Sequence, residues 1–189
     1  MKRIGILGDI GSGKSFIAKS FGHPVFNADK EVARLYKKDI KIFKKLKKLF
    51  PEHILSFPTK KSEIIKAVLA NRNNLKKIVY IVHLEIRKKM NLFLKINKNK
   101  KFVILDIPLL LENKINKKKD ILVFVQSKRL DIEKRLKKRG SYNKKIIKNF
   151  KKIQLPLDYK KKVSHFIIEN NFTKKSVKKD IKKILKKIK

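Results

Sequence analysis

The chain has 189 residues, a formal net charge of +39 and 42% hydrophobic residues. This is enough apolar material to bury the core of one domain, so we expect a folded rather than a disordered protein. The absence of cysteine excludes a disulfide scaffold, a thiolate nucleophile and a Cys-ligated zinc site, and fits a cytoplasmic protein. No apolar run approaches the ~20 residues of a membrane span, and the N-terminal residues indicate a strand and a loop rather than a signal peptide.

A balance this basic often marks proteins that bind nucleic acid or anionic membranes. Only 7 of the 54 basic residues are Arg, however, whereas nucleic-acid readers depend on Arg for bidentate contacts. The chain is also rich in Ile and Asn and has only 6 Gly, a bias toward residues with A/T-rich codons. We therefore attribute the charge to genome base composition. We expect no specific nucleic-acid partner, no membrane and no obligate protein partner.

The predicted elements alternate between short apolar strands and helices. The predicted strands are at 2–7, at 25–27, from 102 onward, at 121–125 and at 165–168. A helix at 15–21 follows the first strand, and helical sequence broken at Pro51 and Pro58 runs from 30 to about 94 after the second. Helical sequence continues from the fourth strand to about 152, and a Lys-rich amphipathic helix follows the fifth. Continuous apolar strands separated by helices indicate a parallel sheet covered on both faces. Five such strands predict a doubly wound α/β core. The gap between the second and third strands is too long for one crossover helix and predicts an inserted helical lobe.

The first strand leads into residues 8–15, GDIGSGKS, which match the P-loop pattern G-x-x-x-x-G-K-[ST] between a strand and a helix. Glycines let the backbone wrap a phosphate with its N–H groups pointing inward, and the helix N-terminus adds a partial positive charge. Lys14 would reach the β- and γ-phosphates, and the Ser15 hydroxyl could hold Mg²⁺. Four of the six glycines lie between residues 5 and 13, which argues against a chance match. The predicted nucleotide-binding residues are Gly8, Gly11, Ser12, Gly13, Lys14, Ser15 and Phe16.

Two carboxylates follow predicted strands. Asp106 comes after four apolar residues, the pattern of a Walker B strand, whose Asp orients Mg²⁺; it could also simply end the strand in a turn. Asp29 lies just beyond the second strand, where a carboxylate could accept a proton from an attacking hydroxyl. Because a helical run follows, Asp29 could equally be a helix N-cap.

Three arginines stand out because Arg is scarce: Arg129, Arg135 and Arg139. The last two are four residues apart, so on a helix they lie on one face. Such a pair could clamp phosphate oxygens from a lid, or it could belong to a solvated helix face.

Taken together and in chain order, these motifs make the chain resemble the dephospho-CoA kinase family. The segments that carry the resemblance cover nearly the whole chain: ILGDIGSGKS, FNADKEVARL, HLEI at 83–86, DIPLLLENK at 106–114, ILVFV followed by RLDIEKRLKKR, and IQLPLDYKKKVSHFIIENN. The P-loop alone indicates only an NTPase. The NAD-x-x-x-AR, D-x-PLL-x-E and Q-x-P…IIENN elements are much narrower.

The resemblance implies a P-loop kinase with an inserted helical substrate lobe and a helical lid in one domain, 1–189. The implied boundaries are a core of 1–29, 100–126 and 153–189, a lobe of about 30–99 and a lid of about 127–152. The implied reaction passes the γ-phosphate of ATP to the ribose 3′-hydroxyl of dephospho-CoA, giving CoA and ADP. ATP and dephospho-CoA would be the substrates and Mg²⁺ the cofactor.

The same resemblance assigns roles to individual residues. Asp29 falls on the family's proposed base and Arg139 falls in the lid, which makes Lys14, Asp29 and Arg139 the expected catalytic residues. Ser15 and Asp106 would hold Mg²⁺, directly or through a water. The residues expected to bind the acceptor are Asp29, Arg34, His83, Leu109 and Glu112.

Several positions depart from the family pattern. They are Asp9 for a common Gly, Phe16 for the usual Thr and Leu84 for the usual Pro after His83. Phe150 stands where the family usually carries a phosphate-facing Arg. The residues that could substitute for it are Lys151, Lys152 and Arg139. A Lys lacks the planar fork of Arg, so such a replacement is not neutral.

Two other functions fit parts of the sequence. The P-loop also suits another small-molecule kinase, acting on a nucleoside monophosphate or shikimate. The charge of +39 would suit a nucleic-acid-stimulated NTPase, but the chain shows no separate nucleic-acid module and no helicase-like motif after Asp106.

Overall fold

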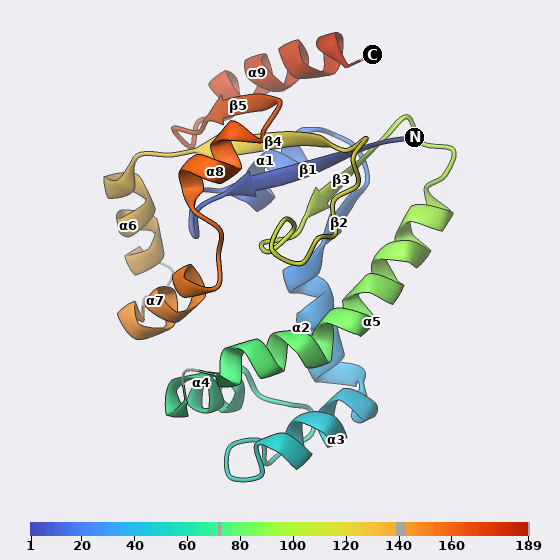
Figure 1. Ribbon diagram of the computed structural model, residues 1–189. Helices are drawn as coiled ribbons and strands as arrows, with labels where there is room; N and C mark the ends of the chain where they lie inside the picture. Colours follow the sequence, from blue (N-terminus) through green and yellow to red (C-terminus); the bar gives the residue numbers. More distant parts are fainter. Residues whose placement is uncertain (72, 139–142, 189) are drawn as a thin grey trace. The chain divides into compact units, whose positions relative to one another are not determined.

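The computed structural model describes residues 1–71, 73–138 and 143–188. Its centre is a five-stranded sheet of order β2-β3-β1-β4-β5 (Figure 1). The strands are β1 (Lys2–Gly8), β2 (Val25–Asn27), β3 (Phe102–Asp106), β4 (Ile121–Gln126) and β5 (Phe166–Glu169). Every neighbouring pair is parallel, which confirms the predicted α/β class and its five strands.

The helices connect and cover these strands. They are α1 (Lys14–Ser20), α2 (Ala28–Lys38), α3 (Ile40–Leu49), α4 (Lys61–Ala70), α5 (Asn74–Ile96), α6 (Arg129–Lys138), α7 (Lys144–Lys152), α8 (Leu157–Lys162) and α9 (Lys174–Lys187). The insertion between β2 and β3 is helical, as predicted, and holds α2 to α5. The sequence did not predict α8, because its 6 residues are too few for helical periodicity to show.

The chain divides into two compact units. Unit 1 comprises Met1–Asn27, Ile96–Tyr142 and Gln154–Lys189, and unit 2 comprises Ala28–Lys95 and Asn143–Ile153. The sheet belongs to unit 1 and the helical insertion to unit 2. The residues expected to form a lid are divided, because α6 belongs to unit 1 and α7 to unit 2.

The sheet of unit 1 is covered on both faces, which is why its central strands are almost continuously apolar. On one face, Ile4 and Ile6 of β1 join a buried cluster with Ile17 of α1 and Ile181 of α9. On the opposite face, α8 lies against β1, in front of the sheet in Figure 1. Gly5 faces Leu110 so closely there that a Cβ would lie 2.5 Å from its side chain. The close approach explains a glycine inside a buried strand.

Unit 2 is built from amphipathic helices. In α3, Ile42 and Leu46 are buried while the lysines of the helix face outward, and Asp39 caps the helix by accepting from the backbone N–H groups of Lys41 and Ile42. Glu63 of α4 accepts a hydrogen bond of 2.6 Å from the Ser56 hydroxyl. Burial alone would raise the pKa of Glu63, but hydrogen bonds from the 55–56 segment and the charge of Lys60 lower it overall.

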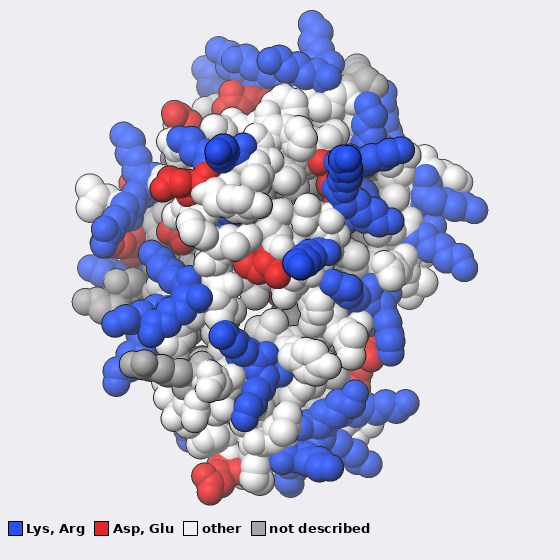
Figure 2. All heavy atoms as spheres, in the orientation of Figure 1, with Lys and Arg blue, Asp and Glu red and all other residues white. Residues whose placement is uncertain are grey.

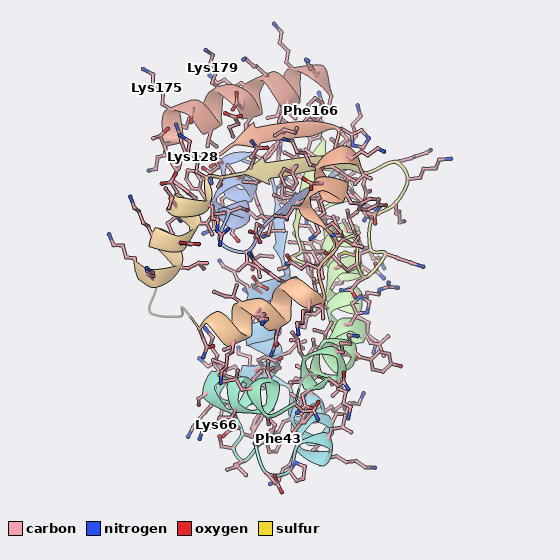
Figure 3. All side chains as sticks on the ribbon, turned by 60° about the vertical axis from the view of Figure 1, so that its left-hand side comes forward. Phe43, Lys66, Lys128, Phe166, Lys175 and Lys179 are labelled. Atoms are coloured by element: carbon pink, nitrogen blue, oxygen red, sulfur yellow. The ribbon has the colours of Figure 1, made fainter. Side chains whose placement is uncertain are left out.

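The surface carries Lys and Arg side chains over both units. Figure 2 shows them spread across the visible face with few acidic groups among them, as expected of a compositional bias. On α9, Lys175 and Lys179 point away from the sheet, whereas Phe166 of β5 packs against the core (Figure 3). Among the described residues, no helix is both long and apolar enough to cross a membrane.

Candidate functional site

The P-loop connects β1 to α1 and has the backbone that its glycines predict. Gly11 and Gly13 have φ angles of 82° and 91°, in the left-handed region where a side chain would be strained. A Cβ on Gly13 would also collide with the side-chain amide of Asn170. These positions therefore require glycine both for backbone conformation and for space.

The side chain of Lys14 folds back over this loop. Its Nζ donates hydrogen bonds to the carbonyl oxygens of Gly8 (3.2 Å) and Asp9 (2.7 Å). The carbonyls hold the ammonium at the loop, where the N-terminus of α1 already favours negative charge. A cation beside a glycine-rich loop and a helix N-terminus is an arrangement that suits a polyphosphate.

Three polar side chains meet where β2 and β3 end next to α1. Asn27 and Asp106 are the last residues of their strands and are paired in register. The Asn27 amide donates to the Asp106 carboxylate and to the Ser15 hydroxyl, 3.4 Å away. Unit 1 therefore brings together Ser15 and Asp106, the two residues predicted to hold Mg²⁺.

These oxygens suit Mg²⁺, which binds hard oxygen ligands, keeps several waters and often shares its coordination with substrate phosphates. In the described ranges, no group of three or more His, Cys, Asp or Glu side chains is placed to hold a metal ion by itself. A site of one hydroxyl and one carboxylate thus fits a metal that is bound mainly by a nucleotide.

Hydrogen bonds also connect the P-loop to residues that follow β4 and β5, on the other side of β1 in the sheet. The carbonyl oxygen of Ser12 accepts from the Ser127 hydroxyl (2.9 Å) and from the Asn170 amide (2.8 Å). Asn170 follows β5 and is only 2% exposed. Sequence reasoning missed this role, although Asn170 lies at the carboxyl end of a strand, the edge where ligands bind in open α/β sheets.

The arginines beyond β4 have different surroundings. Arg135 lies over the ring of Phe172, 4.0 Å from its centroid, and that ring would lie 3.0 Å from a Cβ on Gly13. Arg135 is therefore beside the P-loop. Arg129, by contrast, is 91% exposed and pairs with Glu133, as on a solvated helix face. Arg139 falls outside the described residues.

Glu112 is engaged by the protein itself. Its Oε1 accepts from Lys160 Nζ at 2.6 Å and from the backbone N–H of Leu155 at 3.0 Å. Both side chains are buried, with 9% of Glu112 and 1% of Lys160 exposed. The other oxygen, Oε2, is buried without a hydrogen-bond partner among the described residues. Leu109, on the same loop, is half-buried, and its carbonyl accepts from the N–H of Asn113.

We expect Lys160→Met to destabilise the protein by about 3–5 kcal/mol, because it leaves the Glu112 carboxylate buried without its counter-ion. The double variant Glu112→Gln/Lys160→Met should be more stable than Lys160→Met alone, because it leaves no unpaired charge. Urea unfolding followed by circular dichroism measures both effects. Lys161→Met, at an exposed neighbouring position, is the control. Equal stabilities of Lys160→Met and Lys161→Met would contradict the role of the pair.

Three of the residues predicted to act on the acceptor lie in unit 2: Asp29, Arg34 and His83. Asp29 is the second residue of α2 rather than its N-cap, because the helix begins at Ala28 and not at residue 30 as expected. Its carboxylate is in the first turn, where the helix dipole favours a negative charge. Arg34, on the same helix, is 67% exposed and pairs with Glu31 at 2.6 Å.

His83 lies on the long helix α5. Its Nε2 is buried and has no hydrogen-bond partner among the described residues. Burial, and then the positive charge of Arg87, lower the pKa of His83 below its usual value, so the imidazole is neutral at pH 7.

The structure also places the two aromatic departures from the family pattern. Phe16 is partly buried and packs its side chain against the core of unit 1. Phe150 lies in the last turn of α7, and Lys151 and Lys152 complete that helix.

Comparisons with known sequences and structures point to one family. The sequence pattern of the family described as dephospho-CoA kinase matches residues 2–176. A dephospho-CoA kinase of a Wolbachia from Brugia malayi is 34% identical over 179 residues, covering 92% of this chain and 91% of the relative. One from Aquifex aeolicus is 30% identical over 176 residues, covering 90% and 89%.

Solved structures share the fold. The protein TT1252 from Thermus thermophilus aligns with a TM-score of 0.75 and 25% identity, covering 100% of this chain and 98% of that one. A dephospho-CoA kinase from Campylobacter jejuni aligns with a TM-score of 0.62 and 21% identity, covering 99% and 97%. The match over residues 2–176, with relatives of 30% identity or more along most of the length, confirms the resemblance seen in the motifs: the chain belongs to the dephospho-CoA kinase family.

Proposed function

We propose that the protein transfers the γ-phosphoryl group of ATP to the ribose 3′-hydroxyl of dephospho-CoA. The observation that carries the proposal is the P-loop, with the Lys14 ammonium held at Gly8 and Asp9, beside the cluster of Ser15, Asn27 and Asp106. In the reaction, the 3′-oxygen forms a bond to the γ-phosphorus and the bond to the β-phosphate oxygen breaks. ADP leaves, and the hydroxyl proton passes to a base.

On the donor side, the residues of unit 1 orient ATP and balance its charge. Phosphoryl transfer depends almost entirely on positioning and electrostatic stabilisation, so Lys14 and the backbone N–H groups of the loop supply most of what the step needs. Ser15 and Asp106 would hold Mg²⁺, the latter directly or through water. Bound there, Mg²⁺ would neutralise negative charge on the phosphates.

On the acceptor side, we assign the base to Asp29. It follows Asn27 by two residues, so the chain keeps their α-carbons within about 8 Å of each other. A carboxylate can orient the attacking hydroxyl and take its proton as the phosphoryl group arrives. The alternative considered from the sequence, that Asp29 is a helix N-cap, does not apply, because Asp29 is the second residue of α2.

Four more residues are proposed to bind dephospho-CoA: Arg34, His83, Leu109 and Glu112. Since Oε1 of Glu112 is occupied by Lys160 and Leu155, the oxygen proposed to accept from the substrate is the buried Oε2. Arg139 is proposed to contact the transferred phosphoryl group, with Lys151 and Lys152 as the other cations that could replace an Arg at Phe150.

The test is an ADP-release assay with purified protein, Mg-ATP and a panel of acceptors. We expect ADP to form in step with CoA when dephospho-CoA is present, and only a background rate with adenosine monophosphate or shikimate. Faster phosphorylation of either of those acceptors would overturn the assignment. So would ATP hydrolysis that RNA or DNA stimulates and dephospho-CoA does not.

A further inference from the structure

The side-chain amide of Asn27 contacts both residues that are proposed to hold Mg²⁺. It donates to the carboxylate of Asp106 and to the hydroxyl of Ser15. We infer that Asn27 is a positioning residue that holds these two oxygen ligands in the arrangement that Mg²⁺ requires, before the metal binds. The inference rests on the proposed use of Mg-ATP, but it concerns the contacts of this chain alone.

The sheet fixes this arrangement. Asn27 and Asp106 are the terminal residues of β2 and β3 and are partners in the parallel register. Side chains in register on neighbouring strands project from the same face, so the strand pairing brings the amide to the carboxylate. Asp106 is only 3% exposed, so water does little to solvate its charge and a hydrogen-bond donor is needed there.

An amide can do what a carboxylate at this position cannot. The nitrogen of Asn27 carries two N–H donors, one for Asp106 and one for Ser15. An ionised Asp at position 27 would offer only acceptors and would place a second negative charge against Asp106. The neutral amide adds no charge there, and its two donors keep the Ser15 oxygen close to the Asp106 carboxylate.

Groups that orient metal ligands typically contribute 10–100-fold to metal affinity. The test measures binding of ADP, without any acceptor, by calorimetry in Mg²⁺ and in EDTA. Mg²⁺ increases the affinity for ADP, and the quantity compared is the Mg²⁺ concentration at which half of this increase is reached. For Asn27→Ala we expect this concentration to be about 10–100-fold higher than for the wild type. ADP affinity in EDTA should stay that of the wild type, because the P-loop itself is unchanged. Asn73→Ala, at an exposed position in unit 2, is the control and should match the wild type in both conditions.

A second variant separates metal positioning from a purely structural role. Asn27→Asp places two carboxylates together, so without metal the melting temperature should fall, and Mg²⁺ should restore more of it than it adds to the wild type. If Asn27 only stabilises the sheet edge, Asn27→Ala will weaken ADP binding equally in Mg²⁺ and in EDTA, which overturns the inference. An unchanged Mg²⁺ dependence overturns it as well. Because no acceptor is used, these outcomes are independent of whether dephospho-CoA is the substrate.

Discussion

Lys14→Ala is expected to lower kcat by about 10³-fold or more while the protein stays folded. The transferred phosphoryl group and the β-phosphate lose the positive charge that compensates them in the transition state, and oriented charges of this kind are among the largest contributions to catalysis. The hydrogen bonds given up in the protein without ATP include those to the carbonyls of Gly8 and Asp9. A hydrogen bond of this kind typically contributes about 0.5–1.5 kcal/mol net, so the variant should remain folded.

The measurement is kcat with dephospho-CoA by ADP release, together with the free energy of unfolding in urea. Lys19→Ala is the matched control, because Lys19 lies on the same helix and is exposed. Lys19→Ala should retain the wild-type kcat. This result would show that the loss of activity in Lys14→Ala does not come from removing one positive charge among many. Near-normal turnover in Lys14→Ala would mean that this loop does not bind the ATP that reacts.

Asp29→Asn is expected to lower kcat by about 10²–10⁴-fold, the usual contribution of a general base. Asn has the size of Asp and keeps much of its hydrogen bonding, but it cannot accept the proton of the 3′-hydroxyl. The variant also loses a negative charge in the first turn of α2, which typically costs only about 0.3–1 kcal/mol. Activity and stability should therefore separate clearly.

The experiment compares kcat and the melting temperature of Asp29→Asn with those of Glu31→Gln. Glu31 is in the same first turn, so its variant reproduces the loss of charge near the helix start without touching the proposed base. Because Glu31 pairs with Arg34, kcat is compared at saturating dephospho-CoA, where a change in acceptor affinity does not contribute. A normal kcat in Asp29→Asn would leave Asp29 as a structural residue of α2. A large loss in both variants would point to the helix start rather than to proton transfer.

The fold could be predicted because its signals are local. Apolar runs such as that of β1, buried at every residue but the first, appear only where both faces of a strand are covered. The helix boundaries were less accurate. The start of α2 at Ala28 was missed by two residues, because a helix that begins directly after a strand has no separate capping residue to mark it.

Part of the site could be predicted for the same reason. The P-loop is a contiguous pattern, so Lys14 and Ser15 were identified from spacing alone. The groups that fix the loop in place come from distant parts of the chain: Asn27 bonds to Asp106, 79 residues away, and Asn170 to Ser12, 158 residues away. Such pairings depend on strand order, which a single sequence does not reveal. The buried bond between Lys160 and Glu112 was missed for this reason too, because Lys160 looks like one more surface lysine.

The bond between Asn170 and Ser12 has a consequence for how the protein is made. Asn170 is translated 158 residues after Ser12, the P-loop residue that it holds. Until β5 leaves the ribosome, β4 is an edge strand of the sheet, open to association with other chains, and the Ser12 carbonyl lacks its hydrogen bond from Asn170. A chain that terminates before residue 170 lacks this hydrogen bond, and its Ser12 carbonyl keeps the one from Ser127.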